Sequence, residues 1–282
     1  MTGLSFEFFP SRTEKGTRAM MRAVERLAAL GPDYVSVTFG AGGSDRDGTL
    51  EAVRSCGRAG VPVAAHLCHA GLSEADVIGF AERLREAGAE RIVALRGDGH
   101  ELRDDGFRST PAFVGALAER GFRVSVACYP EVHPLATSPE ADLDVLREKA
   151  KAGAADAIAQ FFFDNARFLR FVRATERAGV RIPIVPGLLP VYAIEKAVKL
   201  GEDCGSAVPG WVRSRFRRAD DAATAKRVGR ELIETQAREL GLAGTEHLHV
   251  YTLNRAELAE AAAAAWREGL AAYRRTELRA AA

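Results

Sequence analysis

An acidic side chain interrupts an apolar stretch near the start of the chain. Residues 4–9 are apolar or aromatic except for Ser5 and Glu7, and Pro10 follows them. Such a run predicts a buried strand that ends at the proline. A carboxylate is rarely buried unless it is paired or used. Glu7 is therefore either a functional acid or base, or a solvent-facing residue of an edge strand.

Polar side chains also stand at the ends of most of the other apolar runs. Asp98 offers a second acid or base, while His66, Arg96 and nearby aromatic residues offer a surface for a flat, partly anionic ligand. Each of these residues alone is compatible with an ordinary hydrogen-bonded structural role. The whole set of run-end residues is Glu7, Thr38, His66, Arg96, Asp98, Tyr129, Glu131, His133, Gln160, Asp164, Thr252, Asn254 and Arg255.

The sequence offers no support for nucleophilic or metal-dependent chemistry. It contains no Ser-His-Asp arrangement of the hydrolase type and no HExxH motif. His247 and His249 alternate along one apolar run in the manner of a metal-binding pair, but no third ligand is evident. We therefore predict no metal site.

The elements that must position these residues alternate regularly. Each of eight apolar runs is followed by a helical pattern; the runs are residues 4–9, 34–39, 61–67, 91–98, 122–129, 157–163, 182–190 and 247–252. This alternation favours a closed (βα)8 barrel, one domain over residues 1–282 with a C-terminal helical extension from about residue 256. A doubly wound open sheet is the alternative, but residues 40–43 lack the GxGxxG spacing. In a barrel, the active site lies at the strand ends where the polar set stands.

Composition limits the partners. The 39 Lys and Arg nearly cancel the 38 Asp and Glu, so no overall charge attracts nucleic acid or an anionic membrane. No signal segment is evident, and no apolar run reaches the roughly 18 residues of a membrane span. The four cysteines form no CxxC pair, which is typical of free thiols in a reducing compartment. These features predict a cytoplasmic protein with a small-molecule ligand.

Seven motifs in order from Ser5 to Arg255 make the chain resemble methylenetetrahydrofolate reductase of the bacterial, single-domain type. They are SFEFFP at residues 5–10, VSVT at 35–38, ALRGD at 94–98, YPEVHP at 129–134, QFFFD at 160–164, PGLLP at 186–190 and YTLNR at 251–255. The resemblance implies a TIM barrel that holds FAD at its C-terminal mouth. It also implies that NAD(P)H reduces 5,10-methylenetetrahydrofolate to 5-methyltetrahydrofolate through this flavin.

The resemblance further implies roles for individual residues. Glu7 would be the general acid that opens the five-membered ring of the folate, and its aromatic neighbours would raise its pKa. Asp98 would lie between flavin and pterin, and Gln160 would hydrogen-bond the pterin edge, which makes both catalytic together with Glu7. Arg255 and Phe168 would bind the folate, and Leu200 would line the same site, although helix packing explains Phe168 and Leu200 equally well. The flavin-binding positions would be Thr38, Phe39, Ala41, His66, Arg96, Gly97, Asp98, Tyr129, His133, Asp142 and Lys149.

Three positions depart from the family pattern around the expected flavin. Ser109 stands where an aromatic contact is usual, Leu135 where a glutamate is usual, and Val145 where the residue is often polar. Two alternatives therefore stay open: direct hydride transfer from NAD(P)H to the folate, and a barrel that binds folate or flavin without catalysis. The Ala-rich tail from Ala256 is strong helix-forming sequence that would pack on the barrel as its eighth helix or pair with another subunit.

Overall fold

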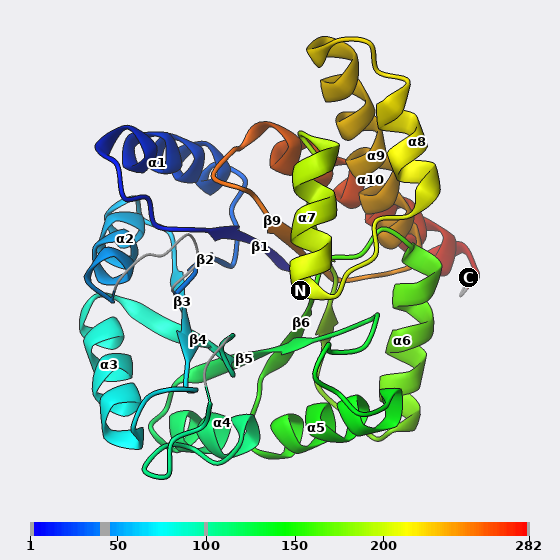
Figure 1. Ribbon diagram of the computed structural model, residues 1–282. Helices are drawn as coiled ribbons and strands as arrows, with labels where there is room; N and C mark the ends of the chain where they lie inside the picture. The colour runs from blue at the N-terminus through cyan, green and yellow to red at the C-terminus, as the bar shows by residue number, and fades with distance from the viewer. Residues whose placement is uncertain (1–2, 40–45, 99–100, 281–282) are drawn as a thin grey trace.

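The computed structural model describes residues 3–39, 46–98 and 101–280, and in it a ring of parallel strands is surrounded by helices (Figure 1). Every strand pairing is parallel, in the order β7-β6-β5-β4-β3-β2-β1-β9-β8. The strands are β1 Gly3–Phe8, β2 Tyr34–Val37, β3 Val63–Cys68, β4 Ala89–Leu95, β5 Arg123–Cys128, β6 Asp156–Ala159, β7 Ile184–Val185, β8 Gly187–Leu188 and β9 His247–Tyr251.

The barrel closes through a strand that is interrupted at Pro186. β7 pairs with β6 and β8 pairs with β9, so the short run from Ile184 to Leu188 joins the two edges of the sheet. Pro186 has no N–H to donate to a ladder, but its carbonyl accepts a hydrogen bond from the His249 N–H at 3.0 Å. The predicted single-domain (βα)8 barrel is confirmed, with its seventh strand split in two.

Helices cover the outside of the barrel, and most of them begin at a side-chain cap. Thr13, Ser73, Ser138 and Asp164, for example, each accept a hydrogen bond from a backbone N–H in the first turn of the helix that follows. The helices are α1 Glu14–Ala28, α2 Arg46–Arg58, α3 Glu74–Glu86, α4 Thr110–Glu119, α5 Pro139–Lys151, α6 Asn165–Arg177, α7 Ile194–Cys204, α8 Gly210–Arg217, α9 Ala222–Leu242 and α10 Glu257–Ala280.

The strands separate two environments, as the alternation of side chains along a strand requires. Phe6 and Phe8 face outward into the apolar layer between sheet and helices. Ser5 and Glu7 face inward, where they meet side chains from other strands. The main apolar core therefore lies outside the barrel wall, and the interior holds polar groups beside a smaller apolar cluster that includes Tyr34, Val93 and Ile158.

The amino-terminal end of the interior is filled by a buried ion pair. Arg91 Nη1 lies 2.6 Å from Asp156 Oδ2 and also donates to Ser125 Oγ at 2.6 Å. The guanidinium carbon of Arg91 lies 4.4 Å from the centre of the Tyr34 ring, in a cation–π arrangement. The two charges thus neutralise each other within the barrel, as a buried ion pair requires, while Asp156 Oδ1 has no hydrogen-bond partner among the described residues.

The tail of the chain packs on its own barrel. α10 runs against α9, and the two backbones approach closely at Gly241 and Gly269, where an added Cβ would lie 2.3 Å from the Trp266 carbonyl oxygen and 2.2 Å from that of Arg238. Trp266 is fully buried, and its indole N–H donates to the Thr245 carbonyl at 3.0 Å. α10 therefore takes the place of the eighth barrel helix.

Within the described part of the chain, we find no helix that is both long and apolar enough to cross a membrane.

Candidate active site

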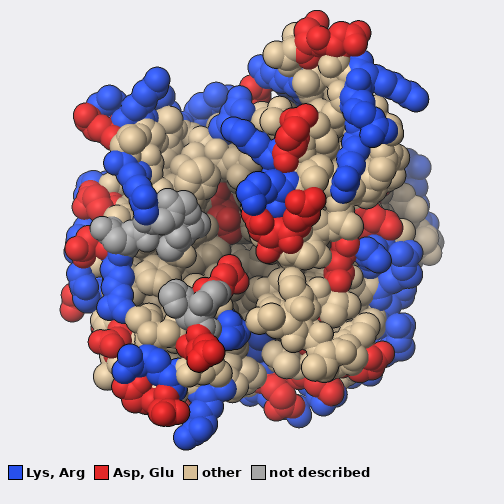
Figure 2. All heavy atoms as spheres, viewed as in Figure 1, with Lys and Arg blue, Asp and Glu red and all other residues tan. Residues whose placement is uncertain are grey.

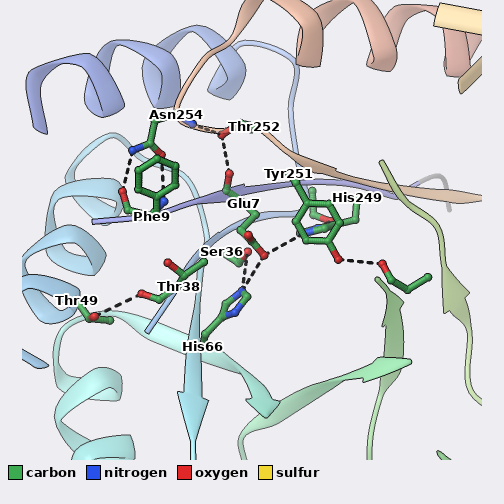
Figure 3. Close-up of polar contacts among 12 residues, drawn as sticks. Glu7, Phe9, Ser36, Thr38, Thr49, His66, His249, Tyr251, Thr252 and Asn254 are labelled. Carbon is green, nitrogen blue, oxygen red and sulfur yellow. Dashed lines mark hydrogen bonds and ion pairs between the residues drawn. The ribbon is translucent and has the colours of Figure 1, made fainter. Parts of the chain in front are cut away.

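Glu7 lies near the carboxyl end of β1, between Ser36 of β2 and Tyr251 of β9 in the strand register. Its Oε2 atom is 3.4 Å from His66 Nε2 and 3.8 Å from His249 Nε2 (Figure 3). The Glu7 side chain is 19% exposed to solvent. Figure 2 shows a hollow at the centre of the barrel in which acidic atoms lie. Glu7 is thus largely desolvated but still reachable from the mouth.

Burial is the main influence on the proton affinity of the Glu7–His66 pair. Desolvation raises the pKa of Glu7 above its ordinary value, and the attraction of His66 only partly opposes this. Burial lowers the pKa of His66, so its imidazole tends to stay neutral, and His66 Nε2 lies 3.3 Å from Ser36 Oγ. Both effects favour a protonated carboxyl group beside a neutral imidazole, which is the state that a general acid needs.

The loop after β9 holds the end of β1 in place. Thr252 donates its hydroxyl to the Glu7 carbonyl at 2.6 Å, and Asn254 both accepts from the Phe9 N–H at 3.0 Å and donates to the Phe9 carbonyl at 2.8 Å. Leu253 and Asn254 have φ angles of 51° and 57°, in the left-handed region that costs energy for residues other than glycine. Strained backbone of this kind is common at functional sites.

A second cluster follows β5, where four of the predicted flavin residues meet. The Tyr129 and His133 rings are in edge-to-face contact with centroids 4.5 Å apart, and Asp142 accepts from the His133 N–H at 3.0 Å. Lys149 of α5 is buried and donates to the Ala127 carbonyl at 3.1 Å. Burial lowers the pKa of Lys149, while the neighbouring Asp142 raises it. The cluster combines a cation, an anion and an aromatic face.

The predicted flavin residues after β2 and β4 are placed as follows. Thr38 is buried, and its hydroxyl has no hydrogen-bond partner among the described residues. The Phe39 ring packs on Phe80 of α3 with centroids 5.5 Å apart, and Ala41 lies outside the described residues. After β4, Arg96 donates to the Gly97 carbonyl at 3.0 Å. Gly97 has a φ of 93°, and a Cβ there would meet Cys68 at 2.9 Å.

The predicted folate-binding residues stand at neighbouring strand ends. Asp98 is exposed after β4. Burial raises the pKa of both Tyr129 and Cys204, and the negative charge of Asp98 raises both further. Glu7 also raises the pKa of Cys204. Gln160 follows β6, and its side-chain oxygen accepts from the Phe161 N–H at 3.0 Å. Arg255 is exposed after β9 and stacks 3.7 Å above the centre of the Tyr192 ring.

One predicted substrate residue is not brought to the mouth. Phe168 of α6 is fully buried, and its ring stacks in parallel on Phe162 with centroids 4.7 Å apart. It is part of the apolar layer outside the barrel, as the packing interpretation expects, and its assignment to the folate site stays a prediction. Leu200 is half-buried on α7 and packs against a separate apolar cluster under α7 to α9.

Two run-end carboxylates serve the scaffold. Glu131 Oε2 lies 2.8 Å from Arg167 Nη1 and also accepts from the Ala207 N–H, while Asp164 caps α6. At the three positions that depart from the family pattern, Ser109 caps α4, and Leu135 and Val145 leave large apolar side chains exposed.

Sequence reasoning gave no site role to the residues that flank Glu7 from the last strand. His249 is fully buried, and Ser5 bonds to its ring; Tyr251 donates to the Ala159 carbonyl at 2.9 Å. The signal that could have found them is the alternation in residues 247–251, which turns His247, His249 and Tyr251 toward one face. Among the described residues, no three His, Cys, Asp or Glu side chains gather as a metal site would require.

A closed parallel barrel with a desolvated carboxyl group and convergent polar side chains at the carboxyl ends of its strands defines a (βα)8-barrel enzyme. Comparison with known proteins narrows this class. A family model described as methylenetetrahydrofolate reductase matches residues 1–265. The 5,10-methylenetetrahydrofolate reductases of Salmonella typhimurium and Escherichia coli are each 38% identical over 261 residues, which is 92% of this chain and 88% of theirs. The chain therefore belongs to the methylenetetrahydrofolate reductase family of oxidoreductases.

Solved structures share the fold at low sequence identity. A Clostridium thermocellum protein that binds two copies of 5-methyl-5,6,7,8-tetrahydrofolic acid has a TM-score of 0.67 at 13% identity, covering 95% of this chain and 94% of its own. Dihydropteroate synthase of Thermus thermophilus has a TM-score of 0.52 at 16% identity, covering 97% and 93%. At these identities the two structures support the barrel architecture alone.

Proposed function

We propose that this protein reduces 5,10-methylenetetrahydrofolate to 5-methyltetrahydrofolate, with Glu7 as the general acid and NAD(P)H as the source of the hydride. The observation that carries the proposal is the desolvated Glu7 carboxyl group, 3.4 Å from a buried imidazole at the mouth of a barrel of this family. The two enterobacterial relatives are named for this activity, and this chain matches them over most of their length. The fold is also shared with a protein that binds the product folate.

Glu7 supplies a proton to the substrate. Protonation of the folate nitrogen N10 breaks its bond to the bridging methylene carbon, which leaves an iminium at N5. The hydride then adds to this carbon and gives the methyl group. A carboxyl group that is ionised at neutral pH would have no proton to give, so the raised pKa of Glu7 is the property on which the step depends.

The residues around the mouth fit a flavin. The buried hydroxyl of Thr38 has no hydrogen-bond partner among the described residues, and a bound ligand would supply one. Tyr129, His133 and Lys149 would hold the rest of the cofactor through an aromatic face and a buried cation. Bound FAD would supply the passage of the hydride from NAD(P)H to the folate.

Three further residues would orient the folate. Asp98, which is exposed after β4, would accept hydrogen bonds from N–H groups of the pterin, and the amide of Gln160 would pair with the pterin edge. Arg255, held flat on Tyr192, offers a cation to the carboxylates of the glutamate tail. None of these roles requires a metal ion.

Replacing the acid tests the proposal directly. In Glu7→Gln, folate reduction should fall by at least roughly 10²-fold, the usual contribution of general acid catalysis, because an amide cannot donate the proton. Oxidation of NAD(P)H by a quinone should be unchanged. Glu119→Gln, the same change at an exposed position on α4, should leave both activities intact. An equal loss of both activities in Glu7→Gln would show that Glu7 is structural.

The cofactor is tested by the visible spectrum of the purified protein after denaturation. FAD release should give a flavin band at close to one equivalent per chain. A protein that lacks this band but still reduces the folate with NAD(P)H would support direct hydride transfer, the alternative that Ser109, Leu135 and Val145 suggest. A protein that binds folate without either activity would be a binding module.

A further inference from the structure

A line of hydrogen-bonding side chains runs from Glu7 through the barrel interior to its amino-terminal face. His249 Nδ1 lies 2.8 Å from Ser5 Oγ, and the same oxygen lies 3.1 Å from His247 Nε2. His247 Nδ1 in turn lies 3.7 Å from Asp33 Oδ2. The line joins the first and last strands of the sheet and passes from the mouth to the opposite end.

The upper end of this line points at the acid. His249 is fully buried, and its Nε2 atom has no hydrogen-bond partner among the described residues; the Glu7 carboxyl oxygen at 3.8 Å is the acceptor or donor that it faces. An unpaired buried ring nitrogen costs stability. A small rotation of the Glu7 side chain closes this gap, and catalytic hydrogen bonds are often long before a substrate binds.

The lower end of the line reaches solvent. The Asp33 side chain is 52% exposed at the start of β2, and the His247 ring beside it is partly exposed. Gly3 leaves the room for this contact, because a Cβ at that position would lie 2.0 Å from His247 Nδ1 and 2.6 Å from Asp33 Oδ2. Any larger residue at position 3 would displace the pair.

We propose that His249, Ser5 and His247 relay protons from the amino-terminal face of the barrel to Glu7. The proposal rests on the general-acid role of Glu7 given above. The reaction consumes one proton per turnover, and Glu7 must regain the proton that it gives to the folate. A folate over the mouth would cover the remaining exposed surface of Glu7, whereas the entrance at Asp33 stays open to solvent.

Each transfer along the line conserves the number of protons. His247 takes a proton from water at Nδ1 and gives its Nε2 proton to Ser5 Oγ. Ser5 gives its own hydroxyl proton to His249 Nδ1, and His249 gives its Nε2 proton to the Glu7 carboxylate. One proton enters and one leaves, and both rings end in the other tautomer, from which they must return before the next transfer.

Burial keeps the two rings neutral, although the nearby carboxylates oppose it. Burial lowers the pKa of His249 to about 3 and that of His247 to about 4, so each ring has one N–H and one bare nitrogen near pH 7. This is the form that can accept a proton on one side and give one on the other. The charged and titratable groups that act on the rings are Glu7, Asp33, His66, Arg91 and Asp156.

The test compares a single turnover with steady-state turnover in His247→Gln. With enzyme in excess over methylenetetrahydrofolate, each Glu7 gives its proton only once and needs no replacement, so the single-turnover rate should equal that of the unaltered protein. In the steady state, kcat should fall about tenfold, which is less than the fall expected for Glu7→Gln. Addition of imidazole, a small proton carrier, should restore kcat. Gly3→Ala, which displaces the same contact without changing either histidine, should behave alike.

His69→Gln provides the matched control, because His69 is also buried but lies outside the line, with Nε2 3.1 Å from Thr110 Oγ1. It should change neither rate. An unchanged kcat in both His247→Gln and Gly3→Ala would refute the relay, and so would an equal drop in the single-turnover rate that imidazole does not restore. If Glu7→Gln still reduced the folate, the general-acid proposal would fail instead, so the two failures are distinguishable.

Discussion

Burial changes the pKa of the titratable side chains inside the barrel. Glu7 and the inward-facing histidines are moved in the same sense, toward the neutral form, because the interior of the barrel disfavours charge. For Glu7 this favours the protonated carboxyl group. For the histidines it makes the folded protein sensitive to acid.

His69 allows one part of this acid sensitivity to be tested. Burial lowers its pKa from 6.5 to about 4, so the unfolded chain binds this proton more readily than the folded one. The stability due to a neutral His69 is fully present above pH 6.5 and is lost as the pH falls toward 4. The melting temperature of His69→Gln should therefore fall less between pH 7 and pH 5 than that of the unaltered protein. An equal fall in melting temperature for the two proteins between pH 7 and pH 5 would contradict this.

At the scale of elements, the decisive one is the turn between β9 and α10. It holds Thr252 and Asn254 on the end of β1, and it carries Arg255 to the rim. Its two consecutive left-handed residues are costly, and the hydrogen bonds from Asn254 to Phe9 offset that cost.

Two substitutions separate these contributions. Asn254→Ala removes the bonds to Phe9 and leaves a Cβ at a φ of 57°, whereas Asn254→Gly removes the same bonds but relieves the backbone. In denaturant unfolding, the Asn254→Ala variant should be less stable than the Asn254→Gly variant by about 1–2 kcal/mol, the usual cost of the left-handed region. Both variants should have a higher KM for the folate than the unaltered protein. Equal stability of the two would mean that the turn relaxes without the asparagine.

At the scale of the whole molecule, the α9–α10 pair fixes the tail to the barrel. The close approach at Gly269 leaves no room for a methyl group, and Arg26 of α1 pairs with Glu260 of α10 at 2.6 Å. Gly269→Ala should separate the helices and lower the stability by about 1–3 kcal/mol, as overpacking usually does.

Tryptophan fluorescence reports this separation directly. The chain has two tryptophans, of which Trp211 is exposed and Trp266 is buried under α9. In a Trp211→Phe background, the emission of Trp266 should shift to the red in Gly269→Ala. The control Gly57→Ala, at a helical position with open space around it, should leave the emission where it is.

Sequence patterns predicted the architecture well and the interior less well. The alternation of strands and helices, and Glu7 at a strand end, follow from local periodicity. The placement of Phe168 required knowledge of which face of α6 meets the sheet, and its stacking partner Phe162 comes from a neighbouring strand end. Ser5 and His249 are 244 residues apart, so their contact arises only when the barrel closes.

The closure between β1 and β9 also gives the protein an order of assembly. Glu7 is made well before His249, Tyr251 and Thr252, which enclose it and lie far later in the chain. A ribosome-bound chain that stops before residue 247 would leave Glu7 in water, where a glutamate is ionised at neutral pH. The enclosed state of Glu7, on which its proposed role as an acid depends, is therefore acquired only after β9 has been made.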